Sequence, residues 1–222
     1  MSRPIVVYGA GGHGREVAAL IGALRAAGAD WDLLGFLSDD PRSVGQQVAE
    51  LPVLGDGEWL RKNVGTAVAL GIGSPVDRQR VVQRITPLVG AFPVLAHPTS
   101  QVMDRVGLEQ GAVVFAGAVV SVDAHIGAFA AVNLLASVSH DCRLGPFATL
   151  APRVALAGNT TIEEGVDLGT GALCIPGVRV GAWSVVGAGA VVIRDLPARC
   201  TAVGVPARVI QGPPPGEPCP SS

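Results

Sequence analysis

A few short segments of this chain carry side chains that could do chemistry. His140 is followed directly by Asp141. A histidine beside a carboxylate can act as a general base near neutral pH, although an ordinary surface histidine is the alternative. Near the N-terminus, Gly9, Gly11 and Gly14 form a glycine-rich turn of the kind that holds a phosphate on backbone amides. The two halves of the chain therefore offer proton transfer and phosphate binding.

The glycine turn stands where a dinucleotide fingerprint needs it, after a strand and before a helix. The hydropathy pattern predicts a strand at 5–8, a helix at 15–27, strands at 33–37 and 67–70, and a helix at 78–85. Strands separated by helices indicate a small parallel sheet of Rossmann-like type. A turn that only packs the helix on the sheet remains an alternative. A complete NAD site is disfavoured because the strands are too few for two mononucleotide halves.

Three loops follow the predicted strands, at 11–14, at Asp39 with Asp40, and at 71–74. The carboxyl ends of parallel strands share one edge, which is the usual ligand crevice. Amides and carboxylates there suit a nucleotide whose base or ribose donates to Asp39 or Asp40, with a solvated turn before Pro41 as the alternative. His13 could reach a phosphate or the sugar, and a local role fits equally well.

A second pattern, with a period of six, runs from Val102 to Val192. Every sixth residue is Val, Leu or Ile except Cys174, and the residue two places earlier is small or β-branched. Neither a helix nor a simple hairpin has this period, which is the hexapeptide signature of a parallel β-helix. Three hexads close a triangular coil, so about five coils form with a spacing of about 4.8 Å. Five glycines follow the aliphatic residue directly, where the chain must bend: Gly127, Gly145, Gly169, Gly181 and Gly187.

The same pattern sorts the remaining candidates, because side chains outside the two inward columns must face solvent or a partner. His140 falls at a coil corner, and His125 projects outward from a flat strand. Two histidines without a third nitrogen or thiolate make a catalytic zinc site improbable. Cys142 and Cys174 occupy inward columns, where cysteine is a small apolar filler.

Composition narrows the class of protein further. The chain has 222 residues, a formal charge of −2 and 4% aromatic residues, which gives no reason to expect nucleic acid or anionic lipid as a partner. No apolar stretch approaches the length of a membrane span, so we expect a soluble, cytoplasmic protein. We predict a Rossmann-like domain at 1–94, a β-helix at 95–212 and a disordered tail at 213–222 that contains Cys219.

Six segments occur in an order that matches a known family. They are Gly9–Gly14, Phe36–Asp40, Gly71–Ser74, Ser139–Cys142, Ala157–Asn159 and Gly204–Arg208. On these residues the chain resembles bacterial nucleotide-sugar acetyltransferases of the sialic-acid O-acetyltransferase type. The resemblance spans Ile5 to Ile210 and is greatest to the GDP-perosamine N-acetyltransferases. It implies an α/β Rossmann-like domain followed by a left-handed parallel β-helix.

The resemblance also implies residue roles. His140 matches the catalytic base, Asp141 the acidic neighbour that orients it, and Gly158 the glycine whose N–H meets the thioester carbonyl. Gly158 comes eighteen residues after His140, which is one coil. It should therefore lie directly beneath the histidine at about one strand spacing, where a base and an oxyanion donor can bracket one acetyl carbon.

The remaining family positions fall into two sets. The nucleotide-sugar pocket corresponds to Gly11, Gly12, His13, Asp39, Asp40 and Gly73. The acetyl-CoA contacts, made largely through backbone, correspond to Thr149, Thr170 and Ala188, with Arg208 meeting a CoA phosphate. The sequence departs from some relatives, which carry histidine in place of Thr149 and lysine in place of Arg208. No metal is implied, and the family implies a homotrimer with active sites between subunits.

The sequence thus predicts transfer of acetyl from acetyl-CoA to an amino group of a nucleotide-linked sugar, either a GDP- or a UDP-4-amino sugar. O-acetylation of a sugar hydroxyl is an alternative. A non-catalytic nucleotide-sugar-binding trimeric scaffold is a second, and an NAD-dependent enzyme fused to a trimerising β-helix is a third.

Overall fold

The computed structural model describes residues 2–212, and the chain divides into two compact units between Pro98 and Thr99. Unit 1 ends at Pro98 and is an α/β domain, whereas unit 2 begins at Thr99 and is built of short strands. The tail predicted to be disordered, with Cys219, lies outside the described residues.

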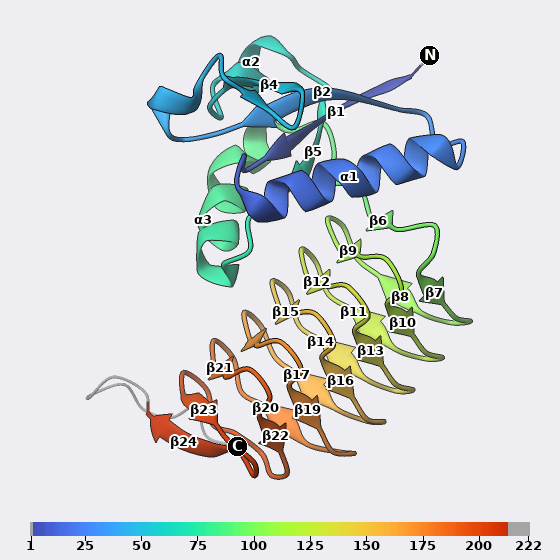
Figure 1. The fold of residues 1–222 in the computed structure, drawn as a ribbon, viewed down its shortest axis with the longest axis vertical. Helices are drawn as coiled ribbons and strands as arrows, with labels where there is room; N and C mark the ends of the chain where they lie inside the picture. Colours follow the sequence, from blue (N-terminus) through green and yellow to red (C-terminus); the bar gives the residue numbers. More distant parts are fainter. Residues whose placement is uncertain (1, 213–222) are drawn as a thin grey trace. The chain divides into compact units, whose positions relative to one another are not determined.

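The sheet of unit 1 has five strands in the order β3-β4-β2-β1-β5 (Figure 1). These are β1 (Arg3–Tyr8), β2 (Trp31–Leu37), β3 (Gln47–Val48), β4 (Leu51–Gly55) and β5 (Ala67–Leu70). All pairs are parallel except β3 with β4. The register sets Tyr8 opposite both Leu37 and Leu70. The loops after β1, β2 and β5 therefore leave the sheet at one edge, as the sequence predicts.

The helices of unit 1 begin earlier than predicted. Helix α1 (Gly12–Ala26) starts three residues before the predicted boundary. Gly14 makes this start possible, because a Cβ there would collide with the carbonyl oxygen of Gly9 at the end of β1. Helix α3 (Pro75–Ile85) starts at a proline behind Ser74, whose Oγ accepts the N–H of Asp77 at 3.3 Å.

Several short elements of unit 1 escaped the hydropathy pattern. They are β3, β4, α2 (Trp59–Lys62), the 3-10 turns at Pro41–Ser43 and Thr86–Leu88, and β6 (Leu95–Ala96). Strand β2 also begins two residues before the predicted start at Leu33. Elements of two to five residues are too short to show a period, which is why the pattern missed them.

Unit 2 is a parallel β-helix of three faces, visible as the stacked ladders of Figure 1. Face I contains β7 (Gln101–Val102), β10 (Val119–Val120), β13 (Ser137–Val138), β16 (Ala155–Leu156), β19 (Leu173–Cys174) and β22 (Val191–Val192). Face II contains β8 (Gly107–Leu108), β11 (His125–Ile126), β14 (Arg143–Leu144), β17 (Thr161–Ile162) and β20 (Arg179–Val180). Face III contains β9 (Val113–Val114), β12 (Ala131–Val132), β15 (Thr149–Leu150), β18 (Asp167–Leu168), β21 (Val185–Val186) and β23 (Thr201–Val203), and it ends with β24 (Arg208–Gln211), which pairs antiparallel with β23.

The interior of the β-helix confirms the two predicted columns. Register partners such as Val120 and Val138 are one coil apart, and both columns are buried from Ala112 onward. Cys142 and Cys174 lie in them as fillers, and burial raises the pKa of the Cys174 thiol to about 12. The prediction is wrong at the N-terminal end, where Val102 is 38% exposed because it lies in the first coil of the stack.

The corners show why a glycine follows the aliphatic residue at five positions. The glycines are needed for close stacking of successive coils and not, as predicted, for a bend of the chain. In every corner from Arg105 to Gly189, the residue three places after the aliphatic residue has a positive φ. Gly145 and the four equivalent glycines do not. A Cβ on Gly145 would instead lie 2.5 Å from the backbone N of Glu164 in the next coil. These glycines permit close stacking of successive corners, while the turn itself is made two residues later.

Within residues 2–212, no helix combines the length and the hydropathy that crossing a bilayer requires.

Candidate active site

His140 and Asp141 lie together in the corner between face I and face II. Asp141 has the left-handed backbone (φ 61) that aspartate tolerates better than most residues. Its Oδ2 lies 2.8 Å from Nδ1 of His140. An ionised carboxylate can only accept a hydrogen bond, so Nδ1 carries the proton and Nε2 of the neutral ring keeps its lone pair. The arrangement leaves a base at Nε2.

Gly158 lies beneath this imidazole in the next coil, as the spacing predicts. A Cβ on Gly158 would lie 2.5 Å from both Cε1 and Nε2 of His140. The two coils are joined at this point by the N–H of Asn159, which donates to the carbonyl oxygen of His140 at 3.0 Å. Only a glycine lets the ring settle against the backbone here, which brings Nε2 next to a peptide group.

The N–H of Gly158 belongs to a column of amides that the β-helix leaves without backbone acceptors. The column contains the residue two places after each aliphatic residue, and none of these N–H groups donates to a backbone carbonyl among residues 104–188. Three members of the column are prolines, which have no N–H to satisfy: Pro146, Pro152 and Pro176. Gly158 therefore offers a donor that the fold itself does not use.

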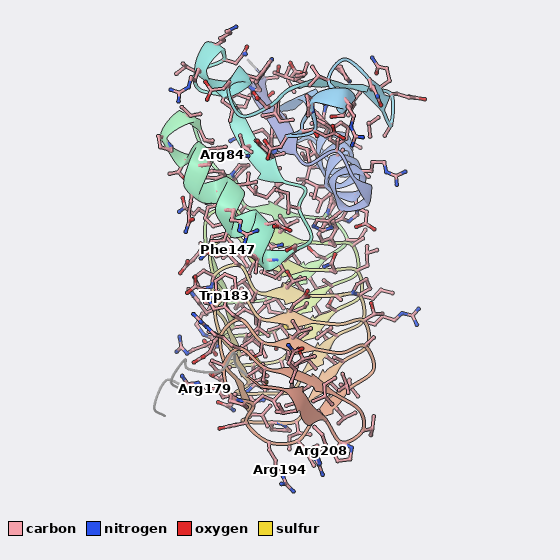
Figure 2. The ribbon with its side chains drawn as sticks, turned by 90° about the vertical axis from the view of Figure 1, so that its left-hand side faces the viewer. Arg84, Phe147, Arg179, Trp183, Arg194 and Arg208 are labelled. Atoms are coloured by element: carbon pink, nitrogen blue, oxygen red, sulfur yellow. The ribbon has the colours of Figure 1, made fainter. Side chains whose placement is uncertain are left out.

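Two other amides of this column show what such a donor binds. The N–H of Ala128 donates to Glu109 Oε2 at 2.9 Å, and that of Ala182 donates to Glu163 Oε2 at 2.7 Å. Both are backbone amides that hold a negatively charged oxygen at the outer surface of a corner. Glu163 also forms an ion pair with Arg179, which is labelled in Figure 2. The Gly158 amide has the same place in its own corner and no such carboxylate.

The predicted CoA positions lie elsewhere on the β-helix. Thr149 is the largely buried first residue of β15, while Thr170 and Ala188 are exposed in successive corners between face III and face I. The N–H groups of both corner residues belong to the same column of amides without backbone acceptors. Arg208 begins β24 at the C-terminal end of the stack (Figure 2). Thr149 and Arg208 lie on face III, and Thr170 and Ala188 follow it, whereas His140 and Gly158 follow face I. The two sets therefore belong to different parts of the coil in a single chain.

Unit 1 has its own cavity, of about 450 Å³, at the carboxyl edge of its sheet. Asp39 lines this cavity: Oδ1 accepts a hydrogen bond from Tyr8 Oη at 2.5 Å, and Oδ2 accepts one from Arg84 Nη2 at 2.6 Å. Arg84 also donates to Tyr8 Oη at 2.7 Å. Burial, followed by the hydrogen bond to Asp39, raises the pKa of Tyr8 well above its usual range. The phenol remains a donor to the carboxylate.

The other predicted nucleotide-sugar residues surround this carboxylate unevenly. Asp40 lines the same cavity, but both its oxygens are paired with Arg42, which lowers the pKa of the carboxyl. His13 lies in the first turn of α1 with Nδ1 3.2 Å from Glu16 Oε2, and burial lowers its pKa. Gly11 and Gly73 are in the loops at the same edge of the sheet and Gly12 is the first residue of α1, and none of the three lines the cavity.

Comparison with known proteins places both units in one family. The description "PglD N-terminal domain" matches residues 4–85. GDP-perosamine N-acetyltransferase from Escherichia coli O157:H7 is 32% identical over 215 residues, which cover 91% of this chain and 94% of that protein. The chain belongs to the family of GDP-perosamine N-acetyltransferase.

Solved structures agree with this assignment. PerB from Caulobacter crescentus, in complex with CoA and GDP-perosamine, is 37% identical with a TM-score of 0.83 over 93% of this chain and 96% of that one. The acetyltransferase domain of PglB from Neisseria gonorrhoeae, in complex with acetyl coenzyme A, is 33% identical with a TM-score of 0.86 over 95% and 100%. The chain is thus an acetyltransferase, and the NAD-dependent and non-catalytic alternatives are set aside.

For this acetyltransferase, sequence reasoning missed the partners of Asp39. Tyr8 is the last residue of an apolar strand, and Arg84 lies on α3, 45 residues after Asp39. Arg80, one helical turn before Arg84, lines the same cavity. The spacing of these two arginines on one face of α3 was the only available signal, and nothing in it points to Asp39.

The described part of this acetyltransferase also has no cluster of three or more His, Cys, Asp or Glu side chains that could hold a metal ion.

Proposed function

We propose that this acetyltransferase transfers the acetyl group of acetyl-CoA to the amino group of a nucleotide-linked 4-amino sugar, with His140 as the general base. The observation that supports this most directly is the position of His140 Nε2 against Gly158, whose N–H donates to no backbone carbonyl among residues 2–212. A base and an oxyanion donor on adjacent coils suit the tetrahedral intermediate of acyl transfer.

In the proposed reaction the sugar nitrogen attacks the thioester carbonyl carbon while one of its protons moves to His140 Nε2. The carbonyl oxygen becomes an oxyanion and accepts the Gly158 N–H. The C–S bond then breaks, and the CoA thiolate takes the proton from the imidazolium, which returns His140 to its neutral form. Asp141 keeps Nδ1 protonated throughout. Two carboxylates on equivalent amides, at Ala128 and Ala182, are ground-state examples of the proposed oxyanion contact.

The nucleotide is proposed to bind unit 1 at the carboxyl edge of its sheet. Asp39 and Asp40 would accept hydrogen bonds from the base or ribose, and the amides of Gly11, Gly12 and His13 at the start of α1 would hold a phosphate, with Gly73 beside them. The Escherichia coli relative is named an N-acetyltransferase and PerB is in complex with GDP-perosamine, which favours an amino sugar over the O-acetylation alternative and GDP over UDP. Acetyl-CoA as co-substrate fits a cytoplasmic location.

We further propose a homotrimer with active sites between subunits. The imidazole of His140 is 57% exposed in the single chain. The proposed CoA residues Thr170, Ala188 and Arg208 follow a different face of the same prism. A second copy that presents face III to the corner of His140 would complete the site, and three copies close into a ring.

The function is tested by thiol release from acetyl-CoA with a panel of GDP-, UDP-, CMP- and dTDP-linked amino sugars and the matching sugars that carry a hydroxyl in place of the amine, for the wild type and His140→Ala. Turnover with a GDP-4-amino sugar that His140→Ala loses supports the proposal. Turnover only with sugars that lack an amine would support O-acetylation instead, and retention of most of the rate by His140→Ala would refute the base.

The subunit arrangement is tested by complementation. His140→Ala and Ala188→Trp proteins, each inactive alone, should regain part of the wild-type rate when they are mixed under conditions that exchange subunits. A mixture that stays inactive although both proteins sediment as mixed trimers would place the whole site within one chain.

A further inference from the structure

The two carboxylate caps follow a rule of spacing. Glu109 caps the amide of Ala128, and Glu163 caps that of Ala182; in both pairs the acceptor residue comes 19 positions before the amide. The acceptor directly follows an aliphatic residue in one coil, and the amide lies in the same corner of the next coil. The side chain at position n is thus directed at the N–H of residue n + 19.

Glycines that directly follow an aliphatic residue show the same geometry, measured by the distance from a Cβ on the glycine to the backbone N of residue n + 19. A Cβ on Gly145 would lie 2.5 Å from the N of Glu164, and one on Gly169 would lie 2.6 Å from the N of Ala188. Both contacts again join residue n to residue n + 19. The rule therefore also holds where residue n is a glycine and has no side chain, as a property of the stacked turns.

For the amide of Gly158 the controlling position is 139, where the chain has Ser139. The serine hydroxyl reaches one atom beyond Cβ, whereas the carboxylate oxygens of Glu109 and Glu163 are three bonds beyond Cβ. Among the described residues no hydrogen bond joins Ser139 Oγ to the Gly158 N–H. Both caps lie in the corner between faces II and III, which carries none of the proposed functional residues.

We propose that position 139 controls access to the Gly158 amide, and that the short side chain of Ser139 keeps this amide available to the reacting carbonyl. A glutamate at position 139 blocks the site, because its carboxylate accepts the Gly158 N–H in the way that Glu109 and Glu163 accept the N–H groups of Ala128 and Ala182. This inference rests on the oxyanion role given to Gly158 under the proposed function.

The experiment compares Ser139→Glu with Ser139→Ala, Ser139→Gln and Ser121→Glu. Ser121 holds the same place one coil earlier, so Ser121→Glu adds the same charge near His140 but caps the N–H of His140, which the reaction does not use. We expect Ser139→Glu to lower kcat by about 10² to 10³-fold, the usual cost of losing one oxyanion donor. Ser139→Ala should keep the wild-type rate, Ser139→Gln should fall between, and KM for acetyl-CoA should stay within a few-fold.

A second readout reports the cap directly and needs no turnover. In Ser139→Glu the amide proton resonance of Gly158 should move downfield and resemble those of Ala128 and Ala182, while Glu109→Ala should move the Ala128 resonance in the opposite direction. The inference is overturned if Ser139→Glu and Ser121→Glu have equal kcat, or if kcat falls while the Gly158 resonance does not move. A wild type without turnover on any sugar would refute the proposed function, and the resonance shifts would still test the spacing rule.

Discussion

The two units position their functional groups by different means. In the β-helix, His140 meets Gly158 because they are one coil apart in a regular repeat, and the donor on offer is a backbone amide. In unit 1, Tyr8, Asp39 and Arg84 meet at one cavity although 76 residues separate the first from the last. A periodic scaffold specifies a site through local spacing, whereas a sheet edge specifies one through the packing of separate elements.

This contrast predicts that the largest effects on rate come from the β-helix. We expect His140→Ala to lower kcat by about 10² to 10⁴-fold, the usual contribution of a general base, with an unchanged melting temperature because the imidazole is exposed. His125→Ala is the matched control: His125 also projects from a coil and pairs with Glu109 at 2.8 Å, yet it should keep full activity. Equal losses in the two variants would contradict the assignment.

Substitution of two glycines distinguishes an effect on coil stacking from an effect on catalysis within the β-helix. Gly145→Ala places a Cβ against the rigid backbone at Glu164, which should lower the free energy of unfolding by about 1–3 kcal/mol. In Gly158→Ala the new Cβ meets the His140 ring, whose exposed side chain can rotate away, so stability should change little.

The displaced base should nevertheless lower kcat of Gly158→Ala by about 10 to 10²-fold. Urea unfolding and steady-state kinetics of both glycine variants check these expectations together. A large decrease in the free energy of unfolding of Gly158→Ala would show that the His140 ring cannot rotate away from the new Cβ.

In unit 1 we expect effects on binding rather than on turnover. Asp39→Asn should raise KM for the nucleotide sugar about 10-fold, equivalent to about 1.4 kcal/mol, and change kcat less. The Arg84–Asp39 pair is about half exposed, so its loss should cost less than about 1 kcal/mol of stability. Asp32→Asn, near the opposite end of β2, the strand that leads to Asp39, is the control. A fall in kcat with an unchanged KM would place Asp39 in the chemistry.

The smallest effect is a pH dependence that reports the burial of Tyr8 together with its hydrogen bond to Asp39. Tyr8 is the only tyrosine, and its pKa is raised in the folded protein. The folded state therefore holds this proton more tightly than the unfolded state, so the free energy of unfolding should fall as the pH rises above the ordinary tyrosine pKa of about 10.

Ultraviolet absorbance of the ionised phenol measures this titration directly. In Asp39→Asn the pKa of Tyr8 should fall part of the way back, because burial still raises it. In Tyr8→Phe the titration should vanish. A wild-type phenol that ionises at its ordinary pH would mean that the Asp39 network does not form.

The predictions made from the sequence succeeded or failed for particular residues according to whether a repeat was present. The six-residue period located the interior columns from Ala112 onward and stacked His140 over Gly158, because each position repeats the geometry of the one before. It misjudged Val102, which belongs to the first coil of the stack, and it gave the wrong reason for Gly145 and its equivalents. Hydropathy also missed β3, β4 and α2, which are too short to show a period.

The sequence alone therefore determined the β-helix and the stacking of His140 over Gly158, because these depend on interactions that repeat at fixed spacing. It also determined the parallel sheet, because strands separated by helices pair in that way. Only the tertiary structure decided which carboxylates cap amides, and that Tyr8 and Arg84 hold Asp39. Those contacts depend on side-chain length and on the approach of distant elements, for which the order of residues carries no period.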